Sequence, residues 1–378
     1  MFAAGGCRTV LLRSNGTAVA RGWNKDGQCN LPALVAGLTY TQVAAGGYHT
    51  VLLRSDGTAV ACGRNDDGQC DLPALVAGLT YTQVATGGYH TVLLRSDGTA
   101  VACGRGDDGQ RDLPALVAGL TYAQVSAGDC HTVLLRSDGT AVACGYNGDG
   151  QCDFPALVAG LTYTQVASGD CHTVLLRSDG SAVACGYNDD GQCDLPALVA
   201  GLSYTQVAAG GGHTVLLRSD GTTAACGGND DGQCDFPALV AGFTYTQVAA
   251  GDCHTVLLTS DGKAVACGCN NVGQCDLPEL TAGLTYSAHL FPALLLQASL
   301  DGDSMRFVTL SGVERCRTVV GSTARLADIY DQLMADRRAG RLGPGIQRVD
   351  AILPRGRLLS DASAEETVAS VFGLAWPV

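Results

Sequence analysis

The sequence has few aromatic residues, few basic residues and no long hydrophobic run. Aromatic residues make up 6% of its 378 positions, and Lys and Arg together number 23 against 36 Asp and Glu. A membrane-spanning helix needs about 20 apolar residues, and no stretch of the chain supplies them. The N-terminal stretch also lacks the apolar core of a secretory signal. We therefore expect an intracellular protein, cytoplasmic or nuclear, that does not bind membranes.

Two further absences narrow the class of protein. Residues 1 to about 287 contain no amphipathic helical pattern, which argues against a helical fold for most of the chain. There are 18 cysteines but no CxxC pair, and the nearest thing to a pair of metal ligands is Cys267-Gly268-Cys269. Because single repeated positions do not converge on one ion, we expect no metal and no cofactor. The thiols are expected to be reduced and packed as small apolar groups.

The sequence is dominated by one unit of 41 residues that occurs seven times. Its most regular mark is a histidine, and Arg8 takes the same position in the first copy. The six histidines are His49, His90, His131, His172, His213 and His254. The copies cover residues 1 to about 287 and leave a separate tail. A period of this length is typical of propellers and other repeat folds.

A His, a Ser and an Asp occur within eight positions of the stretch GGYHTVLLRSDGTAVACG, residues 46–63. These residue types also form catalytic triads. However, His49, Ser55 and Asp56 recur with almost every copy, whereas an enzyme needs one triad in one cleft. Asp-Gly is moreover a signal for a tight hairpin turn. We therefore interpret these residues as architecture and predict no catalytic residues and no enzymatic activity.

Each copy contains four short runs that are typical of β-strands. In residues 31–70 they are ALVA, TQVAA, HTVLLR and TAVAC, separated by Gly-rich or Asp-Gly segments. HTVLLR is apolar on both faces, which indicates a strand that is covered on both sides. Four strands in about 41 residues are typical of a propeller blade. The sequence therefore predicts an all-β, seven-bladed β-propeller over residues 1–290.

The order of motifs in QVAAGGYHTVLLRSDGTAVACGRNDDGQCDLP resembles the repeat of the regulator of chromosome condensation family. The resemblance covers residues 1 to about 287. It implies a propeller whose final blade combines strands from both ends of the chain, and a structural role for the repeated His. The functions known in that family differ. They include nucleotide exchange on a small GTPase through an inserted wedge, ultraviolet-B sensing by clustered Trp residues, and ubiquitin ligation by giant ligases with a catalytic Cys domain.

The chain departs from the pattern that each of these functions requires. Every copy has 41 residues, so no wedge is inserted, and Trp23 is the only Trp within the repeats. The residues after position 287 are too few for a ligase catalytic domain. Our leading hypothesis is a non-enzymatic scaffold that binds protein partners with its loops. The alternatives are a nucleotide-exchange regulator of a small GTPase and the substrate-recognition part of a ubiquitin ligase.

The acidic excess lies in the repeats, largely in one recurring loop. This loop contributes Asp67, Asp108, Asp149, Asp190 and Asp231, and equivalent loops lie on one face of a closed ring. An acidic ring favours basic protein partners and repels nucleic acid, so we expect no binding to nucleic acid. The alternative is that each Asp only serves its own turn.

Two positions differ from copy to copy while the strand interiors hardly change. The residue after the strand-ending Gly is, in order, Trp23, Arg64, Arg105, Tyr146, Tyr187, Gly228 and Cys269. The residue before the repeated His is Cys7, Tyr48, Tyr89, Cys130, Cys171, Gly212 and Cys253. Aromatic and Arg residues near loops are typical of a recognition surface, although drift at tolerant sites gives the same pattern. The predicted partner-binding residues are the aromatic and Arg members of both sets and the five loop Asp residues.

The tail differs from the repeats in composition. We expect a connector at 291–304, whose run LFPALLL completes or covers the last blade, followed by two strands, a helix at 323–340 and two more strands. This order resembles ubiquitin, and RGRLLSDA at 355–362 looks like part of that fold. The resemblance implies a small α+β ubiquitin-like (β-grasp) domain at 305–375 that docks onto ubiquitin-system components. The alternative is a cap that stabilises the propeller.

Overall fold

A computed structural model describes residues 2–280 and 284–286 in full, together with the backbone of four strands between residues 293 and 352. The chain divides into two compact units, Met1–Ala288 and His289–Val378. All regular secondary structure in the described residues is β-structure. Within those residues there is accordingly no helix long and apolar enough to cross a membrane.

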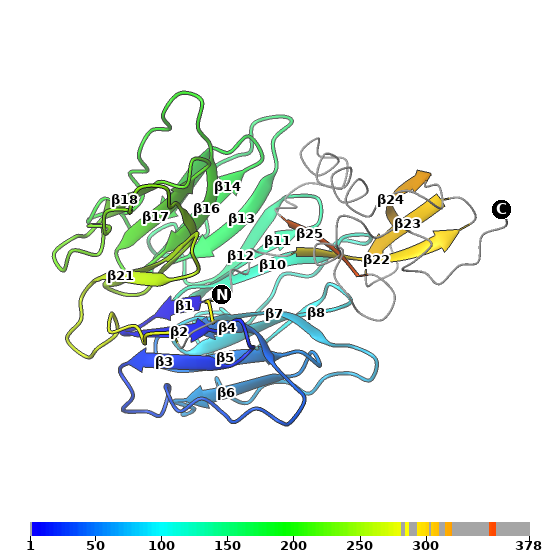
Figure 1. Ribbon diagram of the computed structural model, residues 1–378, viewed down its shortest axis with the longest axis horizontal. Helices are drawn as coiled ribbons and strands as arrows, with labels where there is room; N and C mark the ends of the chain where they lie inside the picture. The colour runs from blue at the N-terminus through cyan, green and yellow to red at the C-terminus, as the bar shows by residue number, and fades with distance from the viewer. Residues whose placement is uncertain are drawn as a thin grey trace. The chain divides into compact units, whose positions relative to one another are not determined.

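The first unit contains seven antiparallel sheets of three strands, which follow one another around a common axis (Figure 1). The inner strands are β1 (Phe2–Gly5), β4 (Tyr40–Ala45), β7 (Tyr81–Thr86), β10 (Tyr122–Ala127), β13 (Tyr163–Ser168), β16 (Tyr204–Ala209) and β19 (Tyr245–Ala250). The middle strands are β2 (Arg8–Leu12), β5 (His49–Arg54), β8 (His90–Arg95), β11 (His131–Arg136), β14 (His172–Arg177), β17 (His213–Arg218) and β20 (His254–Thr259). The outer strands are β3 (Ala18–Gly22), β6 (Ala59–Gly63), β9 (Ala100–Gly104), β12 (Ala141–Gly145), β15 (Ala182–Gly186), β18 (Thr223–Gly227) and β21 (Ala264–Gly268).

The hydrophobic core lies between neighbouring sheets. On middle strand β11, Val133 faces one neighbouring sheet and packs with Tyr163 and Val166 of the next copy. Leu134 points the other way and packs with Val125 and the preceding copy. Both Val133 and Leu134 are fully buried. This arrangement explains why HTVLLR is apolar on both faces, as the sequence predicted.

The repeated Asp-Gly turns join the middle and outer strands. The carboxylate of Asp56 accepts hydrogen bonds from the backbone N–H of Thr58 at 2.9 Å and from its hydroxyl at 2.7 Å. Gly57 has a φ of +79°, a conformation that favours glycine. Asp56 therefore holds a turn, which confirms the architectural interpretation of the SDG motif.

The ring closes through residues from both ends of the repeats. Tyr286 forms a β-bridge with Arg13, the same pairing that Tyr40 makes with Arg54 in the next sheet. Tyr286 also packs in one cluster with Phe2 and with core residues of the last sheet. The first sheet thus receives the start of its inner strand from the far end of the repeats, as the family resemblance implied.

The fourth strand predicted in each copy is absent from the described part of the chain. In the first copy it was ALVA at 33–36, where the chain is instead an extended segment that ends in a turn. Leu34 packs on the core, whereas Val35 is 55% exposed and its carbonyl accepts a hydrogen bond from the N–H of Leu38. Pro32, which has no N–H, precedes it. The segment is therefore held by the packing of Leu34 and by a turn, and it does not pair with a strand.

The second unit contains one sheet of four described strands. They are β22 (Ala293–Asp301), β23 (Ser304–Thr309), β24 (Glu314–Val319) and β25 (Arg348–Ile352), in the order β24-β23-β22-β25, with β22 and β25 parallel. Strand β22 lies within the segment expected to be a connector, and it pairs inside this sheet instead of completing the last blade. The helix predicted at 323–340 lies outside the described residues, so the ubiquitin-like domain stays a prediction.

Candidate partner-binding face

The two positions that vary between copies are neighbours in every sheet of the first unit. The N–H of Arg64 donates to the carbonyl of Tyr48 at 3.0 Å, and the N–H of Tyr146 donates to that of Cys130 at 2.8 Å. Each pair lies where a middle strand begins and an outer strand ends, so all seven pairs lie on one face of the ring. We call this the loop face. Its pairs are Cys7–Trp23, Tyr48–Arg64, Tyr89–Arg105, Cys130–Tyr146, Cys171–Tyr187, Gly212–Gly228 and Cys253–Cys269.

The recurring acidic loop follows directly on each of these pairs. In the second copy, the buried Gln69 side chain accepts a hydrogen bond from the N–H of Asp67 at 3.0 Å, and the Asn65 side chain accepts one from Cys70 at 2.7 Å. Asn and Gln therefore hold the loop backbone. The Asp side chains of the predicted site are exposed: Asp67, Asp108, Asp149, Asp190 and Asp231.

Four of the predicted residues form one contiguous patch across the second and third sheets. The rings of Tyr48 and Tyr89 lie 5.0 Å apart between centroids at an angle of 31°. The guanidinium of Arg64 lies 5.6 Å from the Tyr48 ring and 5.7 Å from the Tyr89 ring, and that of Arg105 lies 5.8 Å from the Tyr89 ring. These distances are within the range of cation–π attraction. We call these four residues the Tyr/Arg patch.

Hydrogen bonds and ion pairs hold the Tyr/Arg patch in place. Arg64 pairs with Asp66 at 2.9 Å, and Arg105 pairs with Asp107 at 3.0 Å. A side-chain hydrogen bond with Tyr48, followed by burial, raises the pKa of Tyr89 to about 12. These contacts hold the four side chains of the patch in one arrangement.

The remaining predicted aromatic residues occupy other parts of the loop face. Trp23 lies beneath the ammonium of Lys25, which is 4.6 Å from the ring centroid. Tyr146 is 43% exposed and Tyr187 is 37% exposed. The structure thus brings four predicted residues together and places the other three on separate sheets of the same face.

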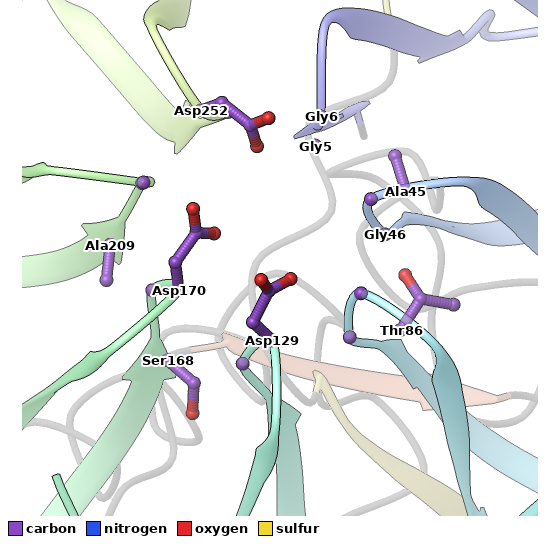
Figure 2. A pocket seen from close by; sticks show the side chains of 18 of the residues that line it. Gly5, Gly6, Ala45, Gly46, Thr86, Asp129, Ser168, Asp170, Ala209 and Asp252 are labelled. Carbon is purple, nitrogen blue, oxygen red and sulfur yellow. The ribbon is translucent and has the colours of Figure 1, made fainter. Parts of the chain in front are cut away.

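The axis of the ring contains three acidic residues that the sequence analysis missed. A cavity of about 60 Å³ is lined by small residues of all seven inner-strand ends and by Asp129, Asp170 and Asp252. Figure 2 shows their three carboxylates directed into this space. Burial, followed by Asp252 and Asp129, raises the pKa of Asp170 to about 8. The signal in the sequence was the position two residues before the repeated His, which is either Gly or Asp.

Asp170→Asn is expected to stabilise the protein at pH 8 by several kcal/mol, because the buried carboxyl no longer has to ionise. Because the folded pKa of Asp170 is raised, its contribution is favourable near pH 4 and is lost as the pH rises to about 8. The buried histidines raise the stability of both proteins over this range, so the test is the difference between them: the free energy of unfolding of Asp170→Asn should increase relative to that of the wild type between pH 6.5 and 8. Urea unfolding at several pH values measures this, with the exposed Asp67→Asn as control. If the free energy of unfolding of Asp170→Asn had the same dependence on pH as that of the wild type, the raised pKa of Asp170 would be contradicted.

The cysteines of the described residues are free thiols. Burial raises the pKa of Cys62 to about 12, so this thiol is inert at neutral pH. Within the same part of the chain, no group of three or more His, Cys, Asp or Glu side chains is placed to hold a metal ion.

The geometry of the first unit is that of a repeat β-propeller. Six segments match the family model of the regulator of chromosome condensation (RCC1) repeat, namely residues 40–69, 81–110, 122–151, 163–192, 204–233 and 245–274. Each segment runs from an inner strand to the Gln of the recurring loop. A comparison with curated proteins by sequence found no match.

Solved structures with a similar fold include two of the yeast protein Prp20 and one of human WBSCR16. Prp20p from Saccharomyces cerevisiae has a TM-score of 0.59 and 19% identity, covering 76% of this chain and 88% of Prp20p. Yeast RCC1 (Prp20) bound to Kap60 has a TM-score of 0.54 and 21% identity, covering 64% and 72%. Human WBSCR16 has a TM-score of 0.55 and 18% identity, covering 64% and 79%. These likenesses show the fold: the repeated part of the chain is an RCC1-type propeller.

Proposed function

We propose that this protein is a non-enzymatic, intracellular scaffold that binds protein partners through the loop face of its propeller. The observation that carries the proposal is the distribution of variation within the chain. The strands that form the core are nearly identical in all copies, while the residues that differ form seven hydrogen-bonded pairs on one face. Aromatic and Arg residues at neighbouring exposed positions are typical of a recognition surface.

The Tyr/Arg patch is the proposed energetic centre of this interface. Tyr and Arg are enriched among the residues that dominate binding energies, especially when they are held in place by their neighbours. The exposed Asp residues around the ring favour partners with basic surfaces. The second unit is proposed to provide a separate docking element, and the cytoplasm or nucleus is the proposed location.

Replacing Tyr48, Tyr89 and Arg105 together by Ala is expected to weaken partner binding by more than tenfold. Each such residue in a binding centre contributes about 2 kcal/mol or more, and 1.4 kcal/mol corresponds to tenfold in affinity. Quantitative affinity capture from cell extract, followed by titration of each captured protein, measures the loss. The control is Val76→Ala with Val117→Ala, which changes exposed residues in the connecting segments of the same copies. A triple variant that keeps every partner would refute the proposed interface.

Nucleotide exchange on a small GTPase is the second candidate. It is favoured by the similar fold of Prp20p, a protein described for its binding to Gsp1p and histones. The equal length of all seven copies leaves no inserted wedge for this reaction. Release of a fluorescent GDP analogue from Gsp1p decides between the candidates: acceleration by the purified chain supports exchange, and an unchanged rate supports the scaffold.

A further inference from the structure

The last sheet is the one described sheet in which both variable positions are cysteines. Cys253 and Cys269 continue the pairing of β20 with β21 by one residue beyond His254 and Gly268. The N–H of Cys269 donates to the carbonyl of Cys253 at 2.8 Å. Opposite residues of an antiparallel pair that are joined by such a hydrogen bond have Cα atoms about 5.5 Å apart. This separation falls within the range of about 4.4–6.8 Å that disulfides span.

Side chains at these two positions extend from the same side of the hairpin. In the second sheet the equivalent residues are Tyr48 and Arg64, and their side chains are in contact. A third thiol lies nearby, because Cys7 occupies the equivalent position in the first sheet and the N–H of Asp252 donates to the carbonyl of Gly6 at 3.1 Å. The three thiols therefore gather where the last sheet meets the first.

The surroundings distinguish the two members of the pair. Burial and then Asp252 raise the pKa of Cys253 to about 11, with smaller effects of the Cys7 and Cys269 sulfurs. The Cys269 sulfur accepts a hydrogen bond from the side-chain amide of Asn271 at 3.3 Å. The thiolate is the nucleophilic form of cysteine.

We propose that Cys253 and Cys269 are a redox modification site that forms a reversible disulfide with a small organic disulfide, such as oxidised glutathione, as oxidant. The Cys269 thiolate attacks one sulfur of glutathione disulfide, forms a mixed disulfide and releases one glutathione thiolate. The Cys253 sulfur, on losing its proton, attacks the Cys269 sulfur and releases the second glutathione. Two protein thiols are thereby oxidised and one glutathione disulfide is reduced to two thiols, which take up the two protons.

The disulfide joins the two ends of the last hairpin, close to the contact between the last sheet and the first. A cross-link of this kind restricts the unfolded chain and raises the thermal midpoint of unfolding. It also replaces two free thiols of the loop face by one fixed bridge. Oxidation is therefore expected to stiffen that part of the face, independently of which partner the protein binds.

The test is disulfide mapping of the full chain by mass spectrometry. The protein is incubated with oxidised glutathione, free thiols are alkylated, and the digested peptides are compared before and after reduction. We expect one linked peptide pair that joins Cys253 to Cys269 and is lost in Cys269→Ser. Cys130 and Cys171, which face Tyr146 and Tyr187 at the same positions, are expected to form no such link.

A gain-of-function variant tests the geometry directly. Tyr187→Cys places a second cysteine opposite Cys171, so a second linked pair involving Cys171 is expected. Three results would overturn the proposal: a bond from Cys253 to Cys7, only mixed disulfides with glutathione, or no link at all. Because no partner is required, this outcome is independent of the binding experiments on the Tyr/Arg patch.

Discussion

Below about pH 5 the propeller is expected to unfold cooperatively, because its six repeated histidines must stay neutral in the folded state. All six are fully buried in the interfaces between sheets. Burial lowers their pKa values to about 3 for His49, His131 and His172 and to about 4 for His90, His213 and His254.

The hydrogen bonds of His131 explain why protonating the second nitrogen of its ring would cost free energy. The Thr173 hydroxyl donates to the carbonyl of Gln151 at 2.8 Å, so its oxygen accepts from the Nε2–H of His131 at 3.0 Å. The Nδ1 atom is then the unprotonated nitrogen, and it is buried without a hydrogen-bond partner. Protonation would place a charge at this atom, next to Gly128 and away from water.

The direction of the pH effect follows from these lowered pKa values. Between pH 6.5 and about 4 the unfolded chain binds protons at these histidines and the folded chain does not, so stability falls as the pH falls. At pH 5 each buried histidine lowers the free energy of unfolding by about 2 kcal/mol relative to neutral pH, and the six together lower it by on the order of 10 kcal/mol. The raised pKa values of Asp129, Asp170 and Asp252 have the opposite effect, since they increase stability as the pH falls, but three groups do not offset six. The loss is comparable with the whole stability of a typical domain, which is about 5–15 kcal/mol.

Circular dichroism with urea titration between pH 7 and 4.5 measures this effect. The variant His131→Gln removes one titrating group, so its stability should depend less steeply on pH than that of the wild type even though its stability at pH 7 is lower. A stability that stays constant from pH 7 to pH 5 would contradict the assignment of neutral, buried histidines.

The sequence was informative wherever a feature depends on local pattern. The 41-residue period, the two apolar faces of HTVLLR and the Asp56-Gly57 turn each depend on a few adjacent residues, and all three are confirmed. The predicted strand at 33–36 was wrong because its apolar residues resemble a strand but Leu34 serves as an anchor. Local pattern does not distinguish these two uses of leucine.

Features that depend on the contact between copies were not predictable from the sequence. Asp129, Asp170 and Asp252 are separated from one another by 41, 82 and 123 residues, and only ring closure directs them into one cavity. The contact between Tyr48 and Tyr89 likewise depends on how two sheets are placed side by side. The sequence identified both tyrosines as variable positions but did not show that they touch.

Arg8 replaces the repeated His at the interface between the first and second sheets. It stands where the other copies have His, and its Nε donates to the Thr50 hydroxyl at 3.0 Å, as the histidines do to their Thr partners. Its longer side chain also donates to the carbonyls of Gly47, at 3.0 Å, and His49. The guanidinium therefore satisfies the same threonine and remains fully buried because each of its nitrogens has a partner.

Gly128→Ala is expected to destabilise the propeller by about 3 kcal/mol or more, because a methyl group on Gly128 would overlap atoms of its own sheet and of the next sheet. A Cβ at this position would lie 2.2 Å from a ring carbon of His131 and 2.4 Å from the carbonyl oxygen of Gly169 in the next sheet. Neither atom can move freely: the imidazole is fixed by Thr173, and the carbonyl belongs to the backbone of an inner loop. The strain would therefore open the interface between two sheets.

Two other glycines provide a graded comparison in the same protein. At Gly88 a Cβ would lie 2.2 Å from the Asp129 carboxylate, a side chain that can turn away, so an intermediate loss is expected. At Gly228 the nearest atom would be 3.5 Å away, so alanine should change stability by less than about 0.5 kcal/mol. Urea unfolding midpoints with an unchanged slope measure the series. Equal midpoints for Gly128→Ala and Gly228→Ala would show that the sheets are not packed this closely around the axis.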